Sequence, residues 1–348
     1  MSQTSEEVRK IQFTGKSTYI ISLPKKWVTS LGLKAGSQVT VSQQNDSLII
    51  NPKDSAETPL QPTYATITIS DKDNLDMITR KIISLYLVGY NLITVKTRSE
   101  RISGLQRNAV KELTKKKLVG TEIIAESPSE IKLQILLSYP ELSIENALRR
   151  MCLIAKSMHE DAIQALKDLN KKLAQEVIQS DDEVDRFSFY IIRQLKAAVQ
   201  NNKILRDIGL ANPRDCLGYR VIVKFVERIA DHATKIAENT ILLKEKPDPN
   251  IFQKLSEMST FAKSIFEYSI TSLFKKDYAL ADNAILKAKE IVKLESEALK
   301  LFTQKTEQTS TPILRIITES IRRTAEYSSD IAEIVLNLNI NQIIRNNV

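Results

Sequence analysis

The segment Glu227-Arg-Ile-Ala-Asp231-His-Ala233 is matched 99 residues further along by Glu326-Tyr-Ser-Ser-Asp330-Ile-Ala332. In both segments two acidic residues stand four positions apart, a spacing that places their side chains on one face of a helix. A basic residue, Lys224 or Arg323, precedes each glutamate by three positions. The pattern therefore predicts an internal repeat, in which one helical unit occurs twice.

The sequence around this repeat favours long helices. The chain has only 8 glycines in 348 residues, and after Pro140 only Gly209 and Gly218 occur. Pro213, Pro249 and Pro312 fall where helices should begin, and apolar residues recur between them with helical spacing. We expect six helices near residues 143–170, 172–203, 213–245, 250–275, 277–305 and 312–338. They would form an all-α bundle of two three-helix repeats, residues 141–246 and 247–348.

The acidic pairs suggest a binding chemistry. A third pair, Asp181 and Asp185, falls on the second expected helix. If the second and third helices pack side by side, four carboxylates can converge, enough oxygen ligands for a divalent or ferric ion such as iron, manganese, magnesium or zinc. The alternative is a solvated acidic surface, with Asp231 paired to Lys235 one turn on. With two histidines and two cysteines, a His/Cys metal site is not expected.

The run Asp181-Asp-Glu-Val-Asp185, with Phe225-Val-Glu227-Arg-Ile-Ala-Asp231-His-Ala-Thr-Lys-Ile-Ala237, resembles the PhoU family of phosphate-uptake regulators. The resemblance implies two three-helix repeats whose E/DxxxD motifs hold metal ions. The ligands that it implies are Asp181, Asp185, Glu227, Asp231, Glu326 and Asp330. The fifth helix departs from the motif and offers Lys293 as a substitute cation. His232 should lie on another helix face than Asp231, as a surface or interface histidine.

The first 54 residues predict a separate β-rich region. Short apolar runs predict strands around residues 11–13, 19–23, 39–41 and 48–50, with turns at Thr14-Gly15 and Asn45-Asp46 and a short helix over 24–32. Residues 1–53 carry seven Lys/Arg against three Asp/Glu, half of the net charge of +8, which favours a polyanion such as DNA as partner. So few apolar residues cannot build a stable core alone, and we expect a dimer.

The run Arg9-Lys-Ile-Gln-Phe-Thr-Gly15-Lys-Ser-Thr-Tyr-Ile-Ile-Ser-Leu23-Pro24-Lys-Lys-Trp27 resembles the AbrB/MazE/SpoVT swapped-hairpin family. The resemblance implies a homodimer in which two chains exchange hairpins and lay basic residues on DNA. By that resemblance the residues that contact DNA phosphates are Arg9, Lys10, Lys16, Lys25 and Lys26. The alternative is a hairpin used only for dimerisation.

A polar segment with two prolines, residues 55–62, reads as a linker to a small α/β domain over 63–140. Strands near 65–69, 92–96, 121–126 and 131–136, with helices near 74–88 and 102–117, predict a βαβαββ layer with its helices on one face of the sheet. We find no phosphate loop or catalytic cluster in it. The run Lys115-Lys-Lys117 is predicted to be a solvated helix end.

The sequence thus predicts a multidomain α+β protein: a swapped-hairpin head, a βαβαββ domain and a PhoU-like helical bundle. This combination resembles archaeal PhoU-type regulators, which implies a non-enzymatic, dimeric regulator of phosphate uptake that binds DNA and senses a metal or docks a phosphate transporter ATPase or signalling component. One alternative is an adaptor that acts on a transporter or kinase without binding DNA, and another is a metallohydrolase. Without a signal segment or membrane span, a cytoplasmic location is expected.

Overall fold

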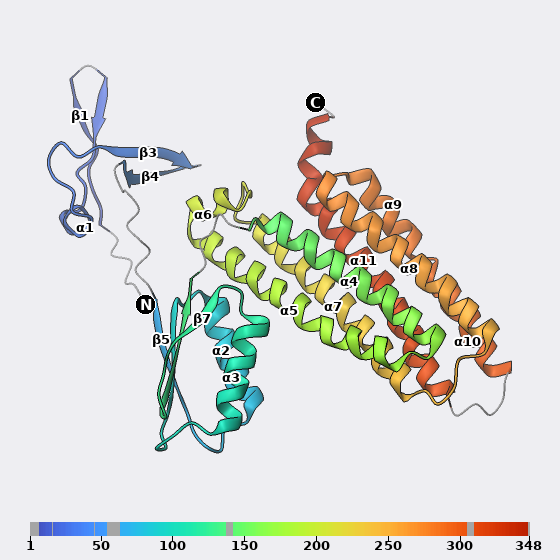
Figure 1. The fold of residues 1–348 in the computed structure, drawn as a ribbon. Helices are drawn as coiled ribbons and strands as arrows, with labels where there is room; N and C mark the ends of the chain where they lie inside the picture. Colours follow the sequence, from blue (N-terminus) through green and yellow to red (C-terminus); the bar gives the residue numbers. More distant parts are fainter. Residues whose placement is uncertain are drawn as a thin grey trace. The chain divides into compact units, whose positions relative to one another are not determined.

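The computed structural model describes residues 7–15, 17–44, 46–53, 63–136, 142–304 and 310–346 (Figure 1). The chain divides into two compact units, Met1–Pro62 and Thr63–Val348. The first is rich in strands, whereas the second combines a four-stranded sheet and its helices with a long helical bundle. The predicted fold class, a multidomain α+β protein that ends in an all-α bundle, is confirmed.

The first unit has two antiparallel hairpins, separated in sequence by a short helix. Its elements are β1 (Gln12–Thr14), β2 (Thr18–Ile20), α1 (Lys25–Ser30), β3 (Val39–Gln44) and β4 (Ser47–Pro52). Gly15 takes a positive φ of 64° in the first turn, whereas Asn45 of the second predicted turn lies outside the described residues. None of the described side chains of this unit is buried, and Tyr19 and Phe13 are 73% and 59% exposed. The unit therefore has no core of its own.

The α/β layer has the predicted βαβαββ order. Its elements are β5 (Tyr64–Ile69), α2 (Leu75–Val88), β6 (Leu92–Thr97), α3 (Gly104–Lys117), β7 (Thr121–Glu126) and β8 (Glu130–Ile135). The strand order is β5-β6-β8-β7, with β5 and β6 parallel and the other pairs antiparallel. Ile78, Ile82 and Tyr86 of α2 pack with Ile93 and Leu133 in a separate core, because alternate strand residues face the helices.

The helical bundle follows the predicted helices with two differences. Its elements are α4 (Ile144–Asp168), α5 (Lys171–Gln200), α6 (Asn202–Asp207), α7 (Asp215–Leu242), α8 (Pro249–Lys275), α9 (Tyr278–Ala288), α10 (Ile291–Gln304) and α11 (Thr311–Asn346). The prediction of an unbroken helix over 277–305 is wrong, since tight bonds from Glu290 N to Lys287 O and from Lys293 N to Glu290 O separate α9 from α10. The short α6 was not predicted, and Asn201 caps its start.

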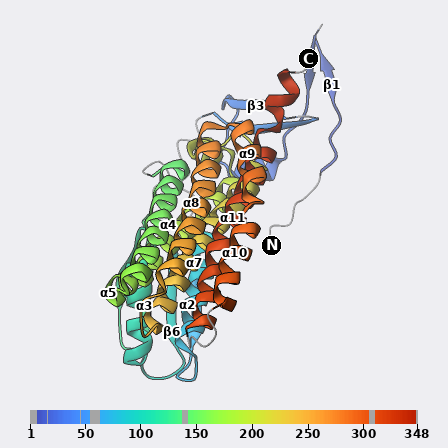
Figure 2. The same cartoon turned by 90° about the vertical axis from the view of Figure 1, so that its right-hand side faces the viewer.

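The two repeats share one apolar core. Helix α7 of the first repeat packs along α11 of the second, and Figure 2 shows both running beside α4 and α8. Gly218 on α7 permits this close approach, because a Cβ there would lie 3.0 Å from Leu338 Cδ2 and 3.2 Å from Ile334 Cγ2. Buried residues from both repeats form one continuous cluster. The repeats therefore form a single folded body.

The α/β layer is docked on the bundle through α5. Helices α2 and α3 lie between the sheet and α5, and both contact it (Figure 1). The guanidinium of Arg193 on α5 is buried, and it donates hydrogen bonds to the carbonyls of Tyr86 at 2.5 Å and Gly89 at 3.2 Å. Gly89 ends α2 with a positive φ of 113°, and its N–H also donates to the Tyr86 carbonyl at 3.2 Å, while Thr63 Oγ1 donates to the Gly89 carbonyl at 3.1 Å. One buried cation thus joins the two layers.

A buried histidine joins the first helices of the two repeats. His159 on α4 is 2% exposed, and its Nε2 lies 2.8 Å from Ser259 Oγ on α8. Burial, together with the nearby charge of Lys263, lowers the pKa of His159 to about 4. The folded protein therefore keeps this ring neutral at pH values where the unfolded chain protonates it.

Between pH 7 and 5, His159 should make the folded state less stable as the pH falls. Its pKa is lower in the folded state than in the unfolded state, so the unfolded chain binds more protons in this range, and the loss is about 2 kcal/mol. His159→Gln can keep a hydrogen bond to Ser259 but does not titrate. Urea denaturation should show the stability advantage of wild type over this variant shrinking by that amount from pH 7 to 5. An unchanged difference would contradict the assignment.

Candidate functional site

The acidic residues of the first repeat meet at the contact between α5 and α7. These helices pack side by side along their length, as the sequence analysis required. Asp181 and Asp185 come from α5, and Glu227 and Asp231 from α7, each pair one helical turn apart. The side chains of Asp185 and Glu227 are only 20% and 16% exposed, so this is a partly buried carboxylate cluster.

The electrostatics of the cluster show that its carboxylates crowd one another. Burial, with the charges of Asp185 and Asp231, raises the pKa of Asp181 to about 7. Burial and the charge of Glu227 also raise the pKa of Asp231. Burial raises the pKa of Asp185 despite an opposing lysine. Each shift means that the cluster resists full ionisation, and so it requires a compensating positive charge.

That charge comes from the chain's own lysines. Lys117 Nζ, at the end of α3, lies 2.8 Å from Asp185 Oδ2 and 2.9 Å from Asp182 Oδ1 on α5. Although burial opposes its charge, these contacts raise the pKa of Lys117 above its usual range. On the α7 side, Lys224 Nζ lies 2.5 Å from Glu227 Oε1, and Ser188 Oγ donates to Glu227 Oε2 at 3.1 Å.

The prediction that residues 115–117 form a solvated helix end is wrong for Lys117. The helix end docks on α5, a contact between layers that the local sequence does not reveal. A local signal existed nevertheless. Lys117 follows the buried Leu113 by four positions, so it lies on the inward face of α3, whereas Lys115 is exposed.

The second repeat balances its acids with arginine. Arg322 lies 2.9 Å from Glu295 of α10 and also pairs with Glu326 on its own helix, and Arg323 lies 3.2 Å from Glu326. Burial raises the pKa of Asp330, helped by the charges of Glu333 and Glu326. Lys293 was predicted as the substitute cation, but it has no ion pair with any described residue, and Arg322 takes that role. Because Arg322 lies on α11, it can pair both with Glu326 of its own helix and with Glu295 of α10.

The described part of the structure gives no grouping of these carboxylates as a set of metal ligands. Among the described residues no group of three or more His, Cys, Asp or Glu side chains is arranged to hold a metal ion. Lys117 and Lys224 instead stand against Asp185 and Glu227, the oxygens that a metal would need. The assignment of iron, manganese, magnesium or zinc to Asp181, Asp185, Glu227, Asp231, Glu326 and Asp330 stays a prediction.

The helices that carry these acids match a known family. The family model described as "PhoU domain" matches residues 148–240 and 255–335, which together make up half of the chain. This chain belongs to the PhoU family. The two matched segments fall on the two repeats of the bundle, so the internal duplication read from the acidic pairs coincides with the PhoU domain.

Individual relatives agree with this assignment. The chain is 32% identical over 143 residues to the phosphate-specific transport system accessory protein PhoU homologue of Aquifex aeolicus, covering 40% of this chain and 61% of that protein. The homologue of Borreliella burgdorferi is 30% identical over 151 residues, 42% of this chain and 63% of that protein. The chain therefore spans about three fifths of the length of these curated relatives.

Two solved structures share the PhoU fold. PhoU from Pseudomonas aeruginosa aligns with a TM-score of 0.50 at 20% identity, covering 56% of this chain and 94% of that one. The phosphate transport system regulatory protein PhoU from Streptococcus pneumoniae aligns with a TM-score of 0.50 at 18% identity, covering 56% of this chain and 92% of that one. Within the described part of this chain, no helix combines the length and apolar character needed to cross a bilayer.

The histidine beside the first motif of the PhoU domain is buried. His232 was predicted as a surface or interface residue, and the surface assignment is wrong because it faces the seam between α7 and α11. Its ring centroid lies 5.8 Å from that of Tyr327 on α11. Burial and the charge of Lys235 lower the pKa of His232 to about 4. It is a packing residue and not part of the carboxylate cluster.

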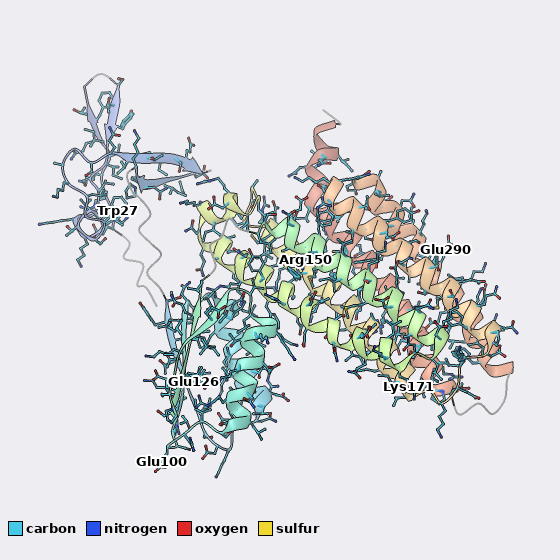
Figure 3. All side chains as sticks on the ribbon, in the orientation of Figure 1. Trp27, Glu100, Glu126, Arg150, Lys171 and Glu290 are labelled. Atoms are coloured by element: carbon cyan, nitrogen blue, oxygen red, sulfur yellow. The ribbon has the colours of Figure 1, made fainter. Side chains whose placement is uncertain are left out.

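Outside the PhoU domain, a second family model matches the head. The model described as "Antidote-toxin recognition MazE, bacterial antitoxin" matches residues 12–58. Of the predicted DNA contacts, Arg9, Lys10, Lys25 and Lys26 are exposed, whereas Lys16 lies outside the described residues. Arg9 pairs with Glu7. Trp27, labelled in Figure 3, is half-buried next to the two lysines of α1.

Proposed function

We propose that this chain is a non-enzymatic regulator of phosphate transport that acts through DNA. Its PhoU domain resembles relatives named as accessory proteins of the phosphate-specific transport system, and its head carries the MazE-type match. In this proposal the head binds DNA, and the helical body receives the phosphate signal or docks a component of the transporter.

The proposal that this chain binds DNA rests on the exposure of apolar and basic side chains in the N-terminal unit. The apolar side chains of Ile11, Phe13 and Tyr19 are all more than half exposed, and Lys25 and Lys26 of α1 are exposed as well. Burying apolar surface stabilises a fold by about 25 cal/mol per Å² of surface removed from water. A second copy of the head would supply that burial. We therefore propose a homodimer that presents Lys25 and Lys26 from both chains to DNA phosphates.

A second candidate function is an adaptor that docks a phosphate transporter ATPase or a signalling kinase without binding DNA. It is favoured by one observation, namely that the PhoU match covers only the helical body. In the adaptor the head would serve only to join two chains. The two candidates differ in whether the basic residues of the head are needed.

A complementation experiment separates the two candidates. In a host that lacks this chain, wild type should restore the dependence of phosphate-transport gene expression on phosphate. The variant Lys25→Ala with Lys26→Ala should leave expression at the level of the deletion strain, because the phosphate contacts to DNA are lost. The exposed pair Lys171 and Lys172 on α5 provides the matched control, and its double alanine variant should restore regulation. Full restoration by the head variant would favour the adaptor.

A further inference from the structure

The carboxylate clusters of both repeats contain built-in cations. In the first repeat the cation comes from a different layer of the fold, since Lys117 is the last residue of α3 and its partners lie on α5. In the second repeat Arg322 bridges α10 and α11. Both acidic clusters are therefore balanced by a basic residue of the chain, which comes from outside the duplicated unit in the first repeat and from within it in the second.

We propose that Lys117 is the resident counter-ion of the first cluster, that it occupies the position where an external cation would bind, and that it ties the α/β layer to the bundle. This inference is independent of DNA binding by the head. The acidic motif alone would leave its carboxylates free to bind a metal ion, but in this chain basic residues already pair with them.

The geometry of Lys117 supports this role. Asp182 and Asp185 stand three positions apart on α5, so one ammonium can reach both, and the two distances differ by only 0.1 Å. The Lys117 side chain is 28% exposed, so water screens its ion pairs less than those of a surface lysine. Lysine has three donors and no lone pair, so it can satisfy the carboxylates but cannot ligate a metal, and its positive charge repels a second cation at the same oxygens.

The neighbouring lysines show that this contact is specific. Lys116 pairs with Glu112 of its own helix, with both side chains more than half exposed. Lys115 is exposed and has no ion pair with any residue that the structure describes. Of the three lysines in the run, only Lys117 crosses from α3 to α5. Its removal would break the only described ion pairs that link these two helices.

Thermal unfolding of the full chain at pH 8, with and without millimolar Mn²⁺, tests the proposal. Without metal, Lys117→Met should melt roughly 3–6 °C below wild type, because Asp182 and Asp185 lose their counter-ion. Mn²⁺ should restore much of that difference in the variant and leave the wild type unchanged. Lys115→Met should behave as wild type in both buffers, and Lys117→Arg should keep the wild-type melting temperature.

Each other outcome overturns the proposal. Equal melting of Lys117→Met and wild type without metal would show that Lys117 is no counter-ion. If Mn²⁺ stabilised wild type as much as the variant, Lys117 would not exclude a cation from the carboxylates. A variant that melts low and gains nothing from Mn²⁺ would show that Lys117 does not occupy a cation position. Elemental analysis of Lys117→Met after dialysis should find bound manganese where wild type has none.

Discussion

A chain with both Lys25 and Lys26 replaced by alanine should bind duplex DNA roughly 100-fold more weakly than wild type at low salt. A dimer that loses two phosphate contacts from each chain loses four cationic contacts in total. The slope of log K against log salt should therefore become shallower by about 3.6. Fluorescence anisotropy with a labelled duplex, titrated across a range of salt, measures both quantities.

The size of the slope change also reports on the dimer. A monomeric head would lose only two contacts, so its slope would change by about 1.8. The charge-matched control is Lys171→Ala with Lys172→Ala on α5, where Lys171 is labelled in Figure 3, and it should leave the slope intact. An unchanged affinity and slope in the head variant would remove the proposed role of α1 in DNA binding.

Arg193→Met should lower the free energy of unfolding of the second unit by about 3 kcal/mol, the largest stability change that we expect from one substitution. The variant keeps much of the apolar stem but loses two hydrogen bonds from a buried charged donor to the carbonyls of Tyr86 and Gly89, which then keep only the Gly89 N–H and the Thr63 hydroxyl as donors among the described residues. It also removes a positive charge from the C-terminal end of α2, where the helix dipole favours it. Urea denaturation followed by circular dichroism measures the loss.

Arg186 supplies the matched control for this substitution. It lies on the same helix, seven positions earlier, and is exposed. Arg186→Met should change stability by less than about 0.5 kcal/mol, as surface substitutions do. Hydrogen exchange at α2 should rise in Arg193→Met and stay at the wild-type level in the control. Equal stability of the two variants would contradict the role of Arg193 as the joint between the layers.

Helices and strands that depend on residues close together in the sequence were predicted well. The repeated acidic pairs predicted the duplication, and apolar spacing together with the prolines in the first turns of α8 and α11 predicted most helix boundaries, because these patterns lie within each helix. The same holds for the alternation of β8, whose Ile131, Leu133 and Ile135 face the helices of the layer. The convergence of the carboxylates was predicted only on the condition that the second and third helices pack side by side, and α5 and α7 do so.

The remaining features depend on contacts between distant segments. Lys117 and Asp185 are 68 residues apart, and Arg193 reaches a carbonyl 107 residues away, so no local pattern encodes either contact. His232 was misplaced for the same reason, since the seam that covers it is made by α11. The break between α9 and α10 has a different origin: neither glycine nor proline marks it, and only the backbone bonds at Glu290 reveal it.

The common core of the two repeats also limits how this duplicated protein can change. Where α7 meets α11 at Gly218, a bulkier residue on one helix has to be answered by a smaller one at Ile334 or Leu338 on the other. Substitutions at this contact are therefore expected to occur in compensating pairs, whereas residues on the outward faces of the two repeats can change independently.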